Sequence, residues 1–394
     1  MFAFLHPARK ALHLLFLPLI AFVLAACEPV MMAPGTAGGP SVDTSKPVPV
    51  ALLVPRGSAT ASDELLATSL ENAARLAMRD LSGVAIDLRV YATAGNAATA
   101  ASAATQAVND GAKIIIGPVY AEAANAAGVA ASGAGVNVLA FSNNTTIAGG
   151  NVFVLGPTFQ TTADRLVSYA TRQGKSRIVV VSAQDVAGQL GRSAIQNAIS
   201  NTGATLAGSV DYPLSQQGVI DAVPRIKAAV DGSGADAVFM TSSTASALPL
   251  LAQLLPEVGI QPAVTQYIGL TRWDIPTPTL SLPGLQGGWF ALPDPARSAA
   301  FAAKYQAAYG SAPHPIAGLG FDGIAAVGAL VAKGQSNALT GAALTQGAGF
   351  QGASGIFRLR SDGTNDRGLA IATIRNNQVV VIDAAPQAFG GAGF

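Results

Sequence analysis

Two kinds of apolar pattern alternate along most of this sequence. Short continuous apolar runs, such as Val48 to Val54 and Ala112 to Ile116, predict buried strands. Longer segments between them, such as Ser62 to Leu81, carry apolar residues three and four positions apart and predict amphipathic helices. Alternating strands and helices are typical of parallel sheets that are covered on both faces.

The predicted elements run from residue 48 to residue 382. The strands are 48–54, 86–91, 112–116, 136–141, 152–155, 177–182, 210–212, 237–241, 263–269 and 287–291. The helices are 62–81, 97–110, 121–133, 161–172, 190–201, 219–230, 245–255, 296–309 and 316–332. Three further segments, 355–359, 369–375 and 379–382, predict antiparallel strands, with turns at Asp362-Gly363 and Asn376-Asn377. A chain of this length suits two α/β lobes with doubly wound parallel sheets better than one core.

The N-terminus has the pattern of an export signal. Two cations, Arg9 and Lys10, precede an apolar run from Ala11 to Ala26. The run ends in Leu24-Ala-Ala-Cys27, which resembles the bacterial lipobox. The resemblance implies that residues 1–26 are a lipoprotein signal peptide and that the thiol of Cys27 carries a diacylglycerol. The alternative is an ordinary signal cleavage with an incidental cysteine.

The composition narrows the possible chemistry. Cys27 is the only cysteine, so the chain has no disulfide framework. Removing residues 1–26 takes Arg9 and Lys10 from the 23 basic residues and none of the 22 acidic ones, which leaves a net charge of −1. This near-neutral charge gives no basic surface for nucleic acid. His314 is the one histidine left after cleavage, so we expect no histidine-based metal site, no cofactor and no serine-histidine triad.

A series of short motifs resembles the type I periplasmic-binding fold of leucine/isoleucine/valine-binding proteins. The motifs are Val50 to Pro55, Ile114 to Pro118, Gly135 to Ser142 and Gly320 to Asp322. The resemblance covers residues 48 to 383 and implies two lobes joined by three crossovers around a cleft. We therefore expect a Pro/Gly-rich tether at 27–47, lobe one at 48–157 plus 292–350, lobe two at 158–291 plus 351–385, and a tail at 386–394.

A narrower set of segments is similar to penicillin-binding-protein activator lipoproteins. The segments are Phe141 to Leu155, Gly287 to Pro295 and Gly349 to Phe357. This resemblance implies a non-catalytic envelope lipoprotein that regulates a bifunctional penicillin-binding protein, which is a peptidoglycan synthase. The chain departs from the best-known members because its tether leads directly into the first strand, without a helical-repeat domain.

Polar residues follow the predicted strands, where ligands bind to doubly wound sheets. By resemblance to amino-acid-binding relatives, Tyr120, Ala121, Ser142, Asn143 and Thr145 stand where hydroxyls and N–H groups hold a ligand carboxylate. In lobe two, Asp185, Thr244 and Asp274 stand at the loops that hold the ammonium group, with Trp273 as a wall. Asp185 and Asp274 could equally be helix caps or turn residues. The candidate ligand-binding residues, with two from the first strand end, are Arg56, Ser58, Tyr120, Ala121, Ser142, Asn143, Thr145, Asp185, Thr244, Trp273 and Asp274.

Three functions compete on this evidence. The first is the regulatory lipoprotein, with no catalytic residue and no metal. The second is the solute-binding component of an ABC importer for amino acids or similar small polar ligands. The third is a hydrolase that uses Asp185 and Asp274. Glu28 follows Cys27, which favours the outer membrane over the inner membrane, and a tether of at most about 70 Å would let the protein reach a distant partner.

Overall fold

The computed structural model describes residues 39–390. The predicted signal peptide, Cys27 and most of the predicted tether lie outside the described residues. Within 39–390, no helix combines the length and the apolar composition that a membrane span requires. The same residues contain no cluster of three or more His, Cys, Asp or Glu side chains able to hold a metal ion.

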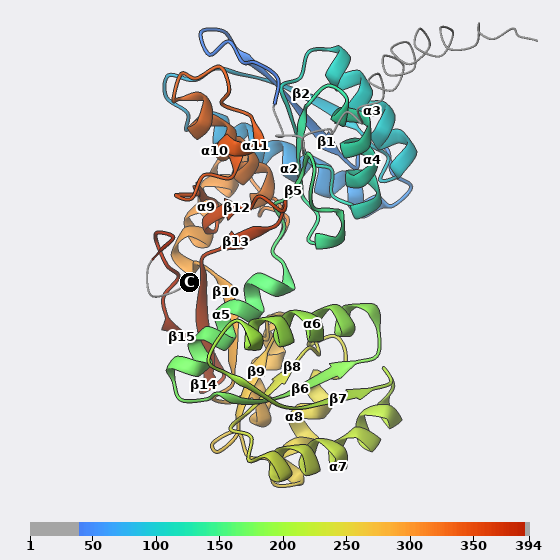
Figure 1. Ribbon diagram of the computed structural model, residues 1–394, viewed down its shortest axis with the longest axis vertical. Helices are drawn as coiled ribbons and strands as arrows, with labels where there is room; N and C mark the ends of the chain where they lie inside the picture. Colours follow the sequence, from blue (N-terminus) through green and yellow to red (C-terminus); the bar gives the residue numbers. More distant parts are fainter. Residues whose placement is uncertain (1–38, 391–394) are drawn as a thin grey trace, which may run out of the picture. The chain divides into compact units, whose positions relative to one another are not determined.

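Lobe one is built on a five-stranded parallel sheet in the order β2-β1-β3-β4-β5. Its strands are β1 (Val48–Val54), β2 (Ile86–Ala92), β3 (Ile114–Ile116), β4 (Asn137–Ala140) and β5 (Val152–Val154). Its helices are α2 (Ala61–Met78), α3 (Ala97–Asn109), α4 (Ala121–Ser132), α9 (Pro295–Tyr309), α10 (Gly318–Val331) and α11 (Gly341–Leu344), with a 3-10 turn η2 (Thr145–Ile147). Helices cover both faces, as predicted (Figure 1).

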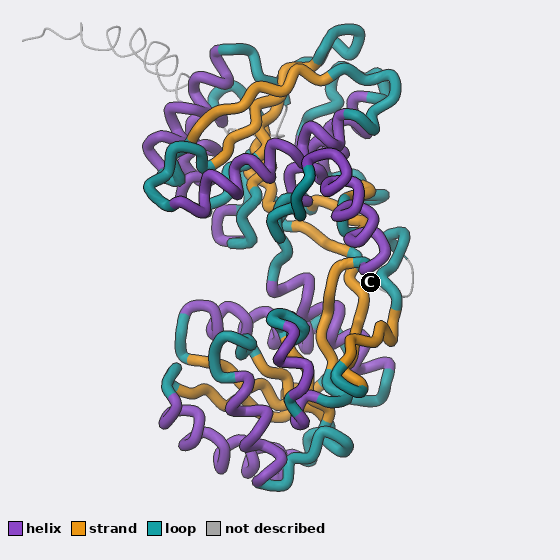
Figure 2. Tube along the Cα trace, turned by 180° about the vertical axis from the view of Figure 1, so that it is seen from behind, coloured by secondary structure: helices purple, strands orange, loops and turns teal. Residues whose placement is uncertain are grey.

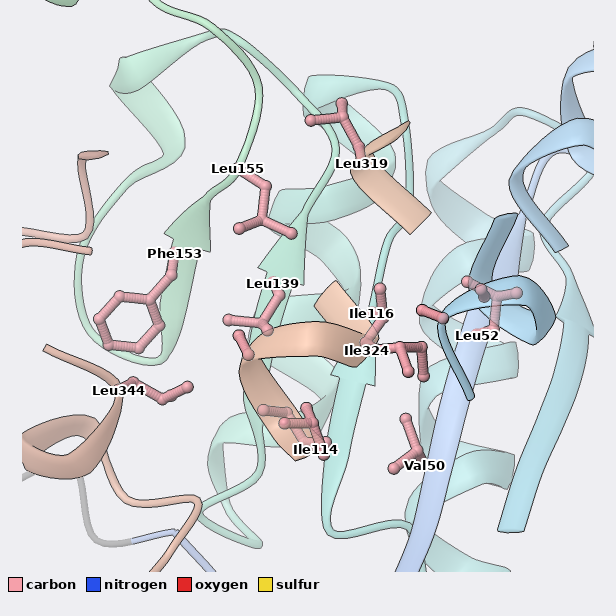
Figure 3. Packing of buried hydrophobic residues seen from close by; sticks show 14 of the residues in the cluster. Val50, Leu52, Ile114, Ile116, Leu139, Phe153, Leu155, Leu319, Ile324 and Leu344 are labelled. Carbon is pink, nitrogen blue, oxygen red and sulfur yellow. The ribbon is translucent and has the colours of Figure 1, made fainter. Parts of the chain in front are cut away.

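The core of lobe one explains the continuous apolar runs in its strands. One face of the sheet packs against α2 and α10, where Val50, Leu52 and Ile324 are fully buried (Figure 3). The other face packs against α3 and α4 through alanines such as Ala104 and Ala127. On the first face, a glycine of α10 allows the backbones of α10 and α2 to approach each other closely. A Cβ at Gly320 of α10 would lie 2.5 Å from the carbonyl oxygen of Leu70 in α2.

Lobe two has a seven-stranded sheet in the order β15-β14-β10-β9-β8-β6-β7. Its strands are β6 (Arg177–Ala183), β7 (Thr205–Tyr212), β8 (Ala237–Met240), β9 (Gln266–Gly269), β10 (Trp289–Pro293), β14 (Leu369–Arg375) and β15 (Gln378–Asp383). Its helices are α5 (Phe159–Arg172), α6 (Val186–Ser200), α7 (Gln216–Ser233) and α8 (Leu248–Glu257), with 3-10 turns η3 (Thr277–Ser281) and η4 (Pro283–Leu285). Helices α7 and α8 cover one face, and α5 and α6 cover the other (Figure 2).

The two C-terminal strands of this sheet are antiparallel, as the sequence predicts. β14 pairs with both β10 and β15, and the β14–β15 hairpin turns at Asn376 and Asn377. Both residues have positive φ, which asparagine tolerates and which a two-residue hairpin of this kind requires. The other strands of lobe two run parallel.

Some elements differ from the prediction for identifiable reasons. β7 begins at Thr205, five residues before the predicted start. The prediction was too short because β7 is an edge strand whose first five residues are exposed or half-buried and form no apolar run. α6 begins at Val186, whose side chain is 77% exposed, so its first turn shows no helical pattern. A third sheet, β11 (Phe350–Gly352), β12 (Gly355–Leu359) and β13 (Asn365–Arg367), was only partly predicted because β13 is a short, polar strand.

The chain passes between the two large sheets three times, as the resemblance implies. The passages lie between β5 and α5, between β10 and α9, and between β13 and β14. Phe357 and Leu359 of β12 belong to the core of lobe one, whereas Leu292 of β10 belongs to the core of lobe two. The predicted division at residues 292 and 351 therefore differs from the structure, because the β11–β13 sheet packs with lobe one.

A buried ion pair joins elements next to these passages. Asp322 of α10 accepts a hydrogen bond from Nη1 of Arg367 at 2.9 Å and another from the backbone N–H of Ala353 at 2.7 Å. Nε of Arg367 donates to the carbonyl oxygen of Leu155 at 3.0 Å, immediately before the first passage. Asn365 donates to the carbonyl oxygens of Val154 and Gly156 at 2.8 and 2.9 Å. The passages are thus tied together by polar contacts away from water.

Candidate functional site

The carboxyl ends of the strands form the candidate site in each lobe. In lobe one the strand order reverses between β1 and β3, and in lobe two it reverses between β6 and β8. Loops at such reversals leave a crevice where doubly wound proteins bind ligands. The predicted residues Arg56 and Tyr120 follow β1 and β3, and Asp185 follows β6. These predicted residues therefore lie at the carboxyl ends of the strands, as the sequence pattern predicts.

Arg56 and Ser58 are already engaged within the chain. Nε of Arg56 lies 3.0 Å from Oε1 of Glu64, and its Nη1 lies 3.2 Å from Oε2 of Glu71, so the guanidinium is neutralised by two carboxylates. The hydroxyl of Ser58 accepts a hydrogen bond from the backbone N–H of Thr60 at 3.1 Å. Neither residue presents an unpaired charge to a ligand.

The start of α4 has unpaired backbone donors. Tyr120 occupies the N-cap position but makes no side-chain capping bond. No described residue accepts a hydrogen bond from the backbone N–H groups of Ala121, Glu122 or Ala123. Four such groups are left open at the start of any helix, and together with the helix dipole they attract anions. This end of α4 can therefore receive a carboxylate.

The side chain of Tyr120 closes the loop beside this helix start. Its hydroxyl donates to Oδ1 of the buried Asp63 at 2.5 Å, and this bond raises the pKa of Tyr120 to about 12. The bond links the β3–α4 loop to the first turn of α2. Tyr120 therefore acts as a positioning residue for the α4 start, and its ring remains 40% exposed.

The loop after β4 contributes hydroxyl and amide groups. Ser142 is buried, and its Oγ accepts a hydrogen bond from the N–H of Asn144 at 3.1 Å. Asn143 and Thr145 line a pocket of about 470 Å³ together with Val186 and Leu190 of α6. Of the eleven predicted ligand residues, this pocket brings together only Asn143 and Thr145.

The two candidate acids of lobe two have structural partners. Asp185 is the N-cap of α6, and its Oδ1 accepts from the N–H of Gly188 at 2.7 Å. Oδ1 of Asp274 lies 2.9 Å from Nε of Arg272. Asp185 is therefore a helix cap and Asp274 a turn residue. The hydrolase hypothesis required these two carboxylates to be free, and both have partners within the chain. Thr244 donates its hydroxyl to the carbonyl oxygen of Ile275 at 2.6 Å.

Trp273 does not form a wall of the site. Its side chain is fully buried in the core of lobe two and stacks on Phe290 with ring centroids 6.1 Å apart. Gly269 and Gly288 leave the space that the indole fills, since a Cβ at either position would lie within 2.3 Å of it. The prediction was wrong because the loop after β9 turns this side chain into the core, which the sequence pattern does not reveal.

Two buried hydroxyl groups at the strand ends of lobe two are not among the predicted ligand residues. Ser182 at the end of β6 is fully buried and has no hydrogen-bond partner among the described residues. The same holds for Oγ1 of Thr241, which follows β8. Burial also raises the pKa of the Tyr212 hydroxyl to about 12, and this hydroxyl lies near Ser242 without a well-formed hydrogen bond. The available signal was a polar residue closing an otherwise apolar strand.

His314 is a structural residue. Its backbone N–H donates to Oγ of Ser69 at 2.8 Å, and its Nδ1 accepts from the N–H of Ile316 at 3.4 Å. Burial lowers the pKa of the imidazole, so the neutral form is favoured near pH 7. The imidazole thus fixes the turn before α10.

The sequence profile described as "Periplasmic binding protein" matches residues 47–378. The chain belongs to this family. The match includes both lobes and all three passages between them, and members of the family are typically non-catalytic. Membership in the periplasmic binding protein family also implies a periplasmic location.

Solved structures with the same fold include several ABC transporter proteins, two of which are named as ligand-binding or substrate-binding proteins. A putative branched-chain amino acid ABC transporter protein from Rhodospirillum rubrum has a TM-score of 0.71 and 16% identity, covering 86% of this chain and 100% of that one. A branched-chain amino acid ABC transporter periplasmic ligand-binding protein from Burkholderia xenovorans has a TM-score of 0.66 and 19% identity, covering 87% and 97%. A substrate-binding protein from Desulfitobacterium hafniense, solved with Leu, has a TM-score of 0.61 and 19% identity, covering 86% and 100%. No curated protein matches the chain by sequence.

Proposed function

We propose that this protein is the extracytoplasmic solute-binding component of an ABC importer for a small amino-acid-like ligand. The observation that carries the proposal is the family match over residues 47–378, which spans both lobes of the fold. The relatives named for transport support this function over regulation of a peptidoglycan synthase. The sequence identity between these proteins and this chain is below 20%, so we infer the ligand from the residues of this chain.

The chemistry of lobe one favours a ligand with a carboxylate. The N–H groups of Ala121, Glu122 and Ala123 are unpaired, and the dipole of α4 adds to their attraction for an anion. Ser142 and Thr145 supply hydroxyl groups in the neighbouring loop. Because Arg56 is neutralised, we expect hydrogen bonds and not a salt bridge to hold the carboxylate.

The chemistry of lobe two favours a ligand whose cationic group is weakly contacted or absent. Asp274 is paired with Arg272, and one oxygen of Asp185 is committed to the start of α6. The hydroxyls of Ser182 and Thr241 are buried without a partner among the described residues, so the remaining oxygen of the half-buried Asp185 is the acceptor that we expect a ligand to reach at this edge. We therefore expect the protein to bind small carboxylates, with leucine, isoleucine and valine as the first compounds to test.

Replacing Ala121 with proline is expected to weaken ligand binding about tenfold, the loss typical of one hydrogen bond to a charged group. Proline removes the N–H at the first position of α4 without breaking the helix, because this position tolerates proline. Tyr120, with φ −79° and ψ 139°, already has the extended backbone that a residue before proline needs. Titration calorimetry with each amino acid and its decarboxylated amine would measure the effect.

Gln216→Pro provides the matched control. Gln216 is the exposed first residue of α7 and follows the N-cap Ser215, so this variant also removes a first-turn N–H from a helix. We expect its affinity to equal that of the unchanged protein. Equal losses in both variants would show that the α4 start does not bind the ligand. Absence of saturable binding of any amino acid or other small carboxylate would contradict the import function.

The regulatory function remains a separate proposal. It depends on the lipid attachment at Cys27, on outer-membrane location and on the short activator-like segments at 141–155, 287–295 and 349–357. Co-purification of the mature protein with a bifunctional penicillin-binding protein would support it. Micromolar amino-acid binding without any effect on peptidoglycan synthesis would favour import.

A further inference from the structure

A second polar pocket, of about 290 Å³, lies beside α5 and the strands β12 and β13. None of its lining residues belongs to the candidate ligand site. Its lining includes four arginines and two aspartates, and two further aspartates outside the lining, Asp322 and Asp383, pair with Arg367 and Arg165. The charged residues of the lining are Arg165, Arg358, Arg360, Arg367, Asp164 and Asp366.

Arg165 provides a buried donor without an acceptor. The residue is only 5% exposed, its Nε donates to the carbonyl oxygen of Leu369 at 2.7 Å, and its Nη2 lies 3.0 Å from Oδ2 of Asp383. Its Nη1 is buried and has no hydrogen-bond partner among the described residues. A buried charged group with an unpaired N–H lowers the stability of the folded state. A bound acceptor from outside the chain would therefore stabilise this nitrogen.

The rest of the lining also has more donors than acceptors. Arg358 and Arg360 share one carboxylate, that of Asp366, at 2.6 and 2.7 Å. Burial raises the pKa of Asp164, and Nε2 of Gln160 donates to Oδ1 of its carboxylate at 2.8 Å. The side chains of Ser168 and Asn201 make no hydrogen bond among the described residues, and both line the pocket.

We propose that this pocket binds a small multivalent oxyanion, of which inorganic phosphate is the simplest. Arginine side chains match the geometry of oxyanions with paired N–H donors, and hydroxyl and amide groups complete such sites. The bound anion satisfies Nη1 of Arg165 and accepts from Arg358 and Arg360, which otherwise share the one carboxylate of Asp366. It also adds contacts between α5 and β13, which already touch where Oγ1 of Thr161 donates to the carbonyl oxygen of Asn365 at 3.0 Å.

Titration calorimetry of the mature protein with inorganic phosphate, at constant ionic strength, tests this site. We expect saturable binding that is at least about tenfold weaker in Arg360→Gln, because the variant loses a charge-assisted hydrogen bond. Arg360 is 49% exposed, so the variant should fold. Ser168→Ala should weaken binding by a smaller factor. Arg75→Gln is the matched control, since Arg75 is 46% exposed and paired with Glu71 far from the pocket in sequence.

Two results would overturn the proposal. One is the absence of saturable heat up to about 10 mM phosphate, where only weak general ion effects remain. The other is an equal loss of affinity in Arg75→Gln and Arg360→Gln, which would indicate a nonspecific charge effect. Amino-acid binding by Arg360→Gln, measured in parallel, is expected to be unchanged, so the outcome is independent of the transport function.

Discussion

Asp322→Asn is expected to lower the free energy of unfolding by about 3–5 kcal/mol, because it breaks a buried ion pair by removing one partner. The variant keeps an oxygen that can accept from the N–H of Ala353, but the buried guanidinium of Arg367 loses its counter-charge. Burial raises the pKa of the Asp322 carboxyl, and the charge of Arg367 opposes this rise. Urea unfolding followed by circular dichroism would measure the loss.

Asp87→Asn is the control for this prediction. Asp87 also pairs with an arginine, Arg89, but both side chains are about 40% exposed. Exposed pairs contribute less than about 1 kcal/mol, so we expect little change. If Asp322→Asn unfolded at the same urea concentration as Asp87→Asn, the buried pair would not stabilise the passages between the lobes. The double variant Asp322→Leu/Arg367→Met should recover much of the loss, since it leaves no unpaired charge in the interior.

Trp273→Ala is expected to cost about 3–5 kcal/mol of stability, as removal of a buried aromatic side chain leaves a cavity. The indole is fully buried between Gly269 and Gly288 and stacks on Phe290. Thermal unfolding should show a clearly lower midpoint. Trp273→Phe should lose less, because phenylalanine refills part of the space.

The second tryptophan of the chain provides the comparison. Trp289 is half-buried, with its ring against Tyr169 at a centroid distance of 4.9 Å. We expect Trp289→Ala to destabilise the protein less than Trp273→Ala. A stable Trp273→Ala variant with weakened amino-acid binding would instead restore the original interpretation of Trp273 as a wall of the ligand site.

The periodic apolar pattern was sufficient to predict the large elements. β1 has the predicted bounds because all but one of its residues are buried, which requires a continuous apolar run. The pattern failed where burial is incomplete or polar. β7 is an exposed edge strand, and β13 buries Asn365 and Arg367, whose partners lie about 45 to 210 positions away in sequence. Such pairing leaves no local signal.

The predicted ligand residues do follow the strand ends, but several of them are engaged within the chain or buried. Strand ends can be read from sequence, so the loops after β1, β3, β4 and β6 were identified. The state of each side chain depends on distant neighbours. Arg56 is neutralised by Glu64 and Glu71, and Tyr120 bonds to Asp63, 57 positions earlier. That the hydroxyl of Ser182 is buried without a partner could not be predicted from the sequence, because it depends on the packing of β6 against β8 and the other neighbours in the sheet.

The sequence by itself determined the α/β class, the two lobes and the strand ends that hold the candidate site, because these depend on local periodicity and on motif order. The tertiary structure decided which polar groups are free to meet a ligand. That choice depends on pairing between residues far apart in the chain, as between Asp322 and Arg367 or between Arg165 and Asp383. Burial strengthens the electrostatic interaction within these pairs, and it also leaves Nη1 of Arg165 without an acceptor. No local sequence pattern shows which of these two outcomes applies to a given polar group.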